Sequence, residues 1–146
     1  MCPLSADFDL MERRPIEERQ RYLEDNLKKF VKYVYDNAPG WKRRFDAAGV
    51  DPLSLTTIKA LERLPILRKD DLLDLQKDYP PLGGLNAIPL HEFATLYISP
   101  GPIFDALPEI EVFLERQARP FRAWGIGEDD IVVNAFAYHL VPAGHE

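Results

Sequence analysis

Two pairs of adjacent carboxylates are the first residues whose types could support acid–base chemistry. They are Asp70–Asp71 and Asp129–Asp130. Neighbouring side chains in a helix or a strand do not converge on one point, so neither pair is suited to share a proton. We expect Asp70–Asp71 to lie in the first turn of a helix, where carboxylates suit the helix dipole. We expect Asp129–Asp130 to form a turn before a strand.

The histidines and the single cysteine offer little further chemistry. His139, His145 and Glu146 do not follow the ligand spacing of a zinc site. Cys2 stands alone, so the chain can form neither an internal disulfide nor a C-x-x-C site. A G-x-S-x-G nucleophile turn is absent from the sequence. The sequence therefore predicts no metal site and no hydrolase-type nucleophile.

Composition excludes several classes of partner. The 146 residues are 46% apolar and 29% charged, which is typical of a folded domain. The net charge of −6 disfavours nucleic acid and anionic membranes, which attract clustered Lys and Arg. The basic turn Lys42–Arg44 is expected to be solvated surface. The sequence has no signal-peptide pattern and no apolar run near the roughly 20 residues of a membrane span, so we expect a cytoplasmic protein.

The elements that must position these residues begin with helices. Residues 1–14 carry no periodic pattern and form a lead-in. Helical spacing of apolar residues predicts four helices, over 15–37, over 41–48, one that ends at 64, and one over 68–77. Ser54 or Thr56 is expected to cap the third. Together these helices make up a helical amino-terminal segment, 15–87.

The second half of the chain predicts a different architecture. Its pattern indicates a strand over 93–98, a tight turn, a helix over 109–124 that Pro120 kinks or splits, and a buried strand over 131–135. Two strands joined by a helix make one parallel crossover unit. We therefore expect an incomplete α/β fold in which 88–146 is the truncated start of an α/β domain, because two parallel strands cannot cover both of their faces.

Three stretches carry a family pattern. Val34–Val50 contains a helix that ends near a proline, then an aromatic and basic residues, then F-x-x-A-G-V. Leu61–Asp71 fits L-x-x-L-P-x-x-x-K-x-D, and Gly125–Tyr138 fits G-x-x-x-x-D-x-V-x-N-x-F-x-Y. In order and spacing they resemble the amino-terminal part of phenylacetate–CoA ligases, members of the adenylate-forming (AMP-dependent synthetase and ligase) superfamily.

The resemblance implies an acid–thiol ligase. Such an enzyme joins a small carboxylic acid, commonly aryl or arylacetic, to AMP with the use of ATP and Mg²⁺, and it releases pyrophosphate. It then passes the acyl group to the thiol of coenzyme A. The family's later motifs, which hold adenine, ribose and a catalytic lysine, have no counterpart in this sequence. We therefore expect the chain by itself to be inactive, and no catalytic residue is predicted within it.

The resemblance also places a phosphate loop at Ser99–Asp105. The family pattern there is S-S-G-T-T-G-K-P, of which only Ser99 and Gly101 are present. Two prolines remove amide donors, and Asp105 adds a negative charge. Two interpretations stay open: Ser99 and Gly101 contact the nucleotide, or the segment is a rigid turn without nucleotide affinity.

Tyr138 and His139 follow the second expected strand, where the resemblance places part of the acyl pocket wall. Tyr138 would stack on an aryl acid, and His139 would hydrogen-bond its carboxylate. Alternatively, Tyr138 is a core residue and His139 a solvated one. A non-catalytic role is also open for the whole chain, as a ligase-derived module that binds protein or forms a homodimer burying its open sheet.

Overall fold

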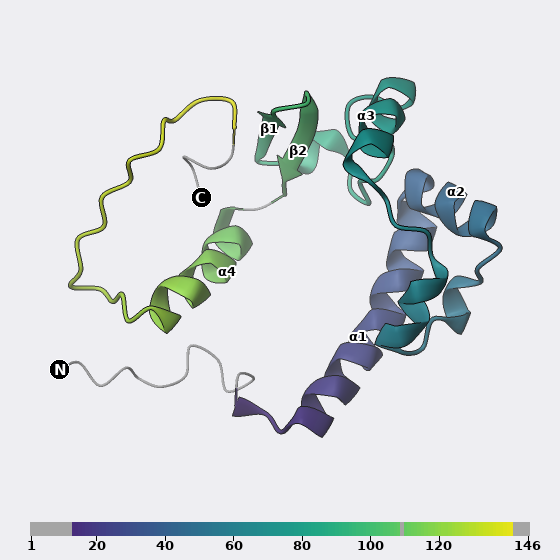
Figure 1. Ribbon diagram of the computed structural model, residues 1–146, viewed down its shortest axis with the longest axis horizontal. Coiled ribbons are helices and arrows are strands. Elements are labelled where there is room, and N and C mark those ends of the chain that lie inside the picture. Colours follow the sequence, from purple (N-terminus) through teal and green to yellow (C-terminus); the bar gives the residue numbers. More distant parts are fainter. Residues whose placement is uncertain (1–12, 109, 142–146) are drawn as a thin grey trace.

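The computed structural model describes residues 13–108 and 110–141, without the side chains of 110–113, 115 and 116. Figure 1 shows a helical layer at one end, a small hairpin beside it, and a last helix followed by extended chain. In chain order the elements are α1 (Ile16–Asn37), α2 (Pro39–Ala48), the 3₁₀ turns η2 (Pro52–Ser54) and η3 (Ile58–Arg63), α3 (Lys69–Asp78), η4 (Leu90–Glu92), β1 (Thr95–Ser99), β2 (Ile103–Leu107) and α4 (Ile110–Ala123).

The first two helices confirm the expected helical layer. Helix α1 starts directly after Pro15 and buries Leu27 and Val31. Helix α2 starts two residues earlier than predicted, because Pro39 occupies its first turn, where a proline loses no helical hydrogen bond. It ends at Gly49, whose φ of 61° is the left-handed conformation that favours glycine.

The third predicted helix is a 3₁₀ segment, and its expected cap is wrong. Thr57 caps it, because its hydroxyl accepts a hydrogen bond from the Ala60 amide at 3.2 Å. Ser54 instead donates its hydroxyl to the Asp51 carbonyl at 2.6 Å. The sequence offered three hydroxyl residues near this helix start, and only the local backbone decides which one faces its free amides.

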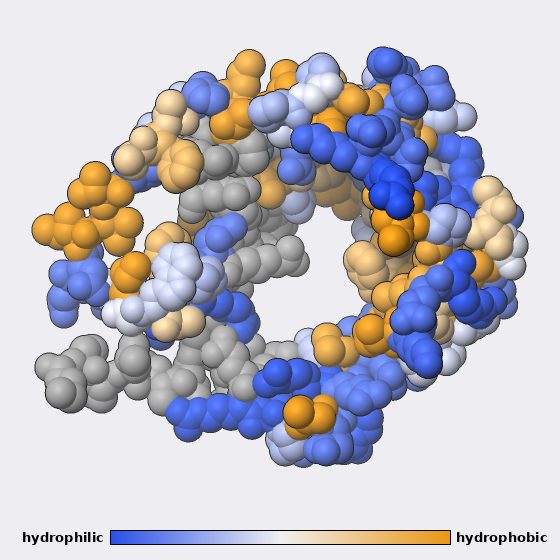
Figure 2. Space-filling view, viewed as in Figure 1, coloured by the Kyte–Doolittle hydropathy of each residue, from blue (hydrophilic) through white to orange (hydrophobic). Residues whose placement is uncertain are grey.

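The core lies between α1, α2 and the η2 turn. Its buried residues are Leu27, Val31, Phe45, Val50 and Leu55. Figure 2 shows that much of the outer surface of the helical layer is hydrophilic. The expected amphipathic pattern therefore packs one continuous core, and it lies within the helical layer rather than around a sheet.

The sheet differs from the expected parallel unit. Strands β1 and β2 pair antiparallel, with Thr95 opposite Leu107 and Ser99 opposite Ile103. The segment expected as a strand-to-helix loop is thus the turn of a hairpin. Residues 131–135 form no strand in the described chain. A hairpin needs only a tight turn, whereas a buried parallel strand needs neighbours that the described residues do not supply.

Helix α4 continues through Pro120, so of the two effects expected of this proline the split does not occur. Its apolar residues Leu114 and Trp124 are 56% and 74% exposed. Phe121 is partly buried and packs edge-to-face on Trp124, with ring centroids 5.9 Å apart. The side chain of Phe113 is outside the described residues.

Candidate functional site

The turn between β1 and β2 holds the two residues expected at a phosphate. The Ser99 hydroxyl donates across the turn to the Ile103 carbonyl at 3.3 Å. Gly101 has φ 153°, and a Cβ there would lie 3.2 Å from the Ile103 side chain. Pro100 and Pro102 carry no amide hydrogen. The turn is therefore suited to a tight hairpin, and it offers few donors for a phosphate group.

Gln76 of α3 joins the helical layer to the hairpin. Its side chain is 8% exposed. Its Nε2 donates to the Phe104 carbonyl at 2.9 Å, and its Oε1 accepts from the Phe104 amide at 2.9 Å. The amide group thus replaces a neighbouring strand on the outer edge of β2. Sequence reasoning missed this residue, although its position four residues after Leu72 on the apolar side of the helix was a signal.

Replacing Gln76 with leucine should lower the free energy of unfolding by about 1–3 kcal/mol, because both hydrogen-bonding groups of Phe104 lose their partner. Urea unfolding followed by circular dichroism measures the change. The matched control is Gln20→Leu, since Gln20 is exposed and its side chain bonds within its own helix to Glu24, at 3.3 Å. Equal unfolding midpoints for the two variants would show that Gln76 does not hold the hairpin.

The other edge of β1 meets the end of the described chain. The Ile98 amide donates to the Leu140 carbonyl at 2.8 Å. This bond brings His139 and Ser99 to the same end of β1, because each is the chain neighbour of a bonded residue. The two predicted parts of the site therefore lie on one hairpin edge.

Tyr138 and His139 both lie at the surface. Tyr138 is 68% exposed, and its hydroxyl accepts a hydrogen bond from the Asn134 side chain at 3.2 Å. His139 Nδ1 accepts from the Val141 amide at 3.4 Å. The interpretation of Tyr138 as a core residue is thus wrong for the described chain. Both side chains remain accessible to a ligand or to a covering segment.

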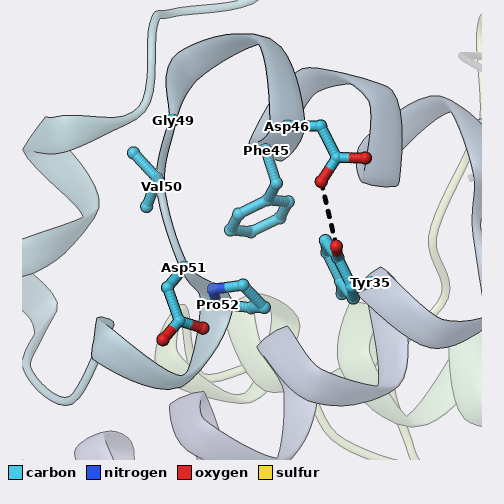
Figure 3. Close-up of a pocket in the computed structure, with 7 residues that line it drawn as sticks. All are labelled: Tyr35, Phe45, Asp46, Gly49, Val50, Asp51 and Pro52. Atoms are coloured by element: carbon cyan, nitrogen blue, oxygen red, sulfur yellow. Dashed lines mark hydrogen bonds between the residues drawn. The ribbon is translucent and has the colours of Figure 1, made fainter.

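A surface pocket of about 370 Å³ lies at the junction of α1 and α2 (Figure 3). Its lining residues are Tyr35, Phe45, Asp46, Gly49, Val50, Asp51 and Pro52. The Tyr35 hydroxyl donates to Asp46 Oδ1 at 2.9 Å, and Lys42 Nζ donates to the Tyr35 hydroxyl at 2.7 Å. The sequence analysis did not predict these contacts, because Tyr35 lies on α1 whereas Lys42 and Asp46 lie on α2.

Lys42, which contacts Tyr35 at the pocket, is not an activated group. The hydrogen bond to Tyr35 is the main cause that raises the pKa of Lys42, with the Asp46 charge adding to it. A raised pKa keeps the ammonium protonated, so Lys42 is neither a nucleophile nor a base at neutral pH. The contacts are suited to holding α1 against α2.

The basic turn is a set of structural contacts rather than simple solvated surface. The Arg43 guanidinium stacks 3.7 Å from the centre of the Tyr79 ring and donates to the Gly83 carbonyl at 3.4 Å. Arg44 donates to the Pro65 carbonyl at 2.8 Å. These cations tie α2 to two later loops, because a guanidinium can stack and donate at once.

Asp70–Asp71 lies in the first turn of α3, as expected, and Asp129–Asp130 lies at a turn, although the strand expected after it does not form in the described residues. Asp71 accepts from the Arg68 amide at 3.1 Å at the start of α3. Asp130 accepts from the Gly127 amide at 2.7 Å in a turn. Among residues 13–108 and 110–141, no three His, Cys, Asp or Glu side chains are grouped to hold a metal ion. Cys2, His145 and Glu146 lie outside the described residues.

The helices of the described chain include none that is both long and apolar enough to span a membrane.

Comparison with known proteins finds relatives that share one name. The chain is 33% identical over 140 residues to the phenylacetate–coenzyme A ligase of Thermus thermophilus, covering 92% of this chain and 30% of that protein. It is 29% identical over 146 residues to the Escherichia coli protein of the same name, covering 96% and 32%. The chain thus spans about a third of the length of these relatives. No family model matches it.

Solved structures agree with the sequence comparison. A 2-hydroxyisobutyryl-CoA ligase in the postadenylation state, in complex with 2-HIB-AMP, superposes with a TM-score of 0.83 at 25% identity. The match covers 90% of this chain and 28% of that one. A second structure of that ligase, with R3-HIB-AMP, gives a TM-score of 0.88 over 99% of this chain, at an identity of 23% that bears on the fold alone. Over nearly its whole length the chain is therefore similar to phenylacetate–coenzyme A ligases, and it has the fold of the matching part of an adenylate-forming CoA ligase.

Proposed function

We propose that this chain is the amino-terminal part of a ligase that activates a carboxylic acid with ATP and transfers the acyl group to coenzyme A. The observation that carries the proposal is the 33% identity to a phenylacetate–coenzyme A ligase over 92% of the chain. The similarity to a ligase structure that holds an acyl-adenylate supports it. The acid that the proposal favours is aryl or arylacetic, since four relatives carry the phenylacetate name.

The chain's own residues indicate which role each of its segments has. We place a helical scaffold at 15–87 and the start of the AMP-binding domain at 88–146, with Gln76 joining the two. Tyr138 and His139 are exposed at the β1 edge and are the residues we assign to the acyl pocket wall. The complete enzyme would use ATP with Mg²⁺ and coenzyme A. Because the turn at 99–105 offers few hydrogen-bond donors, we assign most of the phosphate contacts to the remainder of the ligase.

The chain alone should show no heat of binding with ATP and Mg²⁺ at millimolar concentration in isothermal titration. The physical reason is that the Ser99 hydroxyl already bonds to Ile103 and the flanking prolines lack amide hydrogens. Measurable heat that disappears in Ser99→Ala would restore the interpretation that Ser99 contacts nucleotide. Phe30→Ala, altered at an exposed residue remote from the turn, serves as the control variant.

A covalent chimera tests the ligase function. The matching third of the Thermus thermophilus enzyme is replaced by this chain, and pyrophosphate release is measured with phenylacetate, ATP, Mg²⁺ and coenzyme A. The chimera should release pyrophosphate, whereas the chain alone should not. An inactive but folded chimera that stays inactive when 99–105 is exchanged for the relative's own residues would overturn the proposed function. If pyrophosphate release recovered on that exchange, the defect of the chimera would lie in the turn at 99–105.

A further inference from the structure

A single row of hydrogen bonds crosses the hairpin from the helical layer to the last described residues. Phe104 of β2 stands opposite Ile98 of β1. Both backbone groups of Phe104 bond outward to the Gln76 side chain, each at 2.9 Å. The Ile98 amide bonds outward on the other side, to the Leu140 carbonyl at 2.8 Å. Outward-facing groups on both strands are the geometry of a non-hydrogen-bonded antiparallel pair, so these four residues form one cross-hairpin row.

The two ends of the cross-hairpin row lie in different surroundings. Gln76 is 8% exposed and belongs to α3 in the helical layer. At the other end, residues 131–140 are exposed and form no strand in the described chain. Figure 1 shows α3 beside β2 and the end of the yellow trace beside β1. Gln76 is therefore the buried anchor of the row, and the bond to Leu140 connects an exposed segment to it.

We propose that Gln76 is a positioning residue for the acyl pocket, and that the cross-hairpin row fixes where Tyr138 and His139 stand relative to the helical layer. The proposal rests on the proposed function, which assigns these two side chains to the pocket wall. Their neighbour Leu140 takes the bond from Ile98, so a displacement of β2 also displaces the wall. A buried amide suits this role because its donor and acceptor fix both the distance and the register of a strand, whereas an apolar contact is non-directional.

The acyl pocket and the phosphate contacts depend on different residues. The pocket wall holds the acid, whereas the turn at 99–103 offers few hydrogen-bond donors to the phosphates of ATP. A displaced wall should therefore impair the use of the acid and leave the use of ATP unchanged. The effect is large enough to measure, because a misplacement of about 1 Å caused by a distant substitution can cost roughly a hundredfold in rate.

Replacing Gln76 with leucine in the chimera described above tests this role. The KM for phenylacetate should rise roughly tenfold, and the KM for ATP should stay within about twofold of its value in the parent chimera. Ile98→Pro breaks the row at its other end, since proline has no amide hydrogen, and should raise the KM for phenylacetate similarly. Because both variants release the same wall, the double variant should be no worse than Ile98→Pro alone. Gln20→Leu, exposed on α1, is the matched control and should change neither KM.

Hydrogen exchange on the isolated chain gives a readout that needs no activity. In Gln76→Leu the Ile98 amide should exchange about tenfold faster, although it lies on the other strand, because loss of the bonds to Phe104 loosens the whole row. Amides of α1 should keep their exchange rates, which would show that the variant is folded. An unchanged rate at Ile98 in a folded variant would overturn the proposal.

Two kinetic results would overturn it as well. Equal rises in both KM values would mean that Gln76 supports the fold in general rather than the acyl pocket. An unchanged KM for phenylacetate would mean that the pocket wall does not depend on the row. A parent chimera that releases no pyrophosphate counts against the proposed function alone, and the exchange rate of Ile98 then decides whether Gln76 positions the segment.

Discussion

Replacing Phe45 with alanine should lower the free energy of unfolding by about 3–5 kcal/mol, the cost typical of removing a buried phenylalanine. Phe45 is 2% exposed and sits in the core cluster with Val31 and Leu55. Its ring also packs edge-to-face on Tyr35, with centroids 5.7 Å apart. A loss of this size approaches the whole stability of a small domain, so the cooperative unfolding transition should be severely weakened.

Phe30→Ala is the matched control for Phe45. It removes the same side chain from a position that is 63% exposed on α1, so its effect should stay within about 0.5 kcal/mol. Urea unfolding followed by tryptophan fluorescence measures both variants, since Trp41 packs against the core. Similar losses for the two variants would mean that the core does not lie between α1 and α2.

Replacing Gly40 with alanine should destabilise the chain by about 3 kcal/mol, although the same change in an ordinary helix stabilises by roughly 0.5–1 kcal/mol. Gly40 is buried in α2, and its amide donates to the Gly84 carbonyl at 2.7 Å. An added Cβ would lie 2.6 Å from the Gly83 carbonyl oxygen and 2.8 Å from that of Gly84. Both obstacles are backbone atoms, so a side-chain rotation cannot relieve the contact.

Gly127→Ala is the control for this contact. A Cβ at Gly127 would find nothing nearer than the Asp130 side chain, at 3.8 Å, so its effect should be small. Thermal unfolding of the two variants separates them. If Gly40→Ala raised the melting temperature, helix propensity would outweigh the contact, and α2 would not lie against the loop at Gly83 and Gly84.

The sequence alone was sufficient to predict that residues 15–87 form a helical layer. Spacing of apolar residues located α1 to within one residue, because a helix that buries one face has a period that survives in the sequence. Three motifs, the last of them Gly125–Tyr138, were also sufficient to indicate the resemblance to phenylacetate–CoA ligases. The relatives confirm this resemblance. The carboxylate pairs were assigned their structural places for the same reason, since a helix start and a turn are local events.

The tertiary structure decided what depends on contacts between distant residues. The predicted loop at Ser99 became a hairpin because Ile103–Leu107 pairs back on β1, and Gln76, from 28 residues away, completes the edge of β2. The predicted strand over 131–135 has a strand's composition but no strand pairing, since pairing requires neighbours that composition cannot supply. Local periodicity thus determined which segments are helical, and long-range packing alone determined how the hairpin, the glycine contact and the apolar segment 131–135 are arranged.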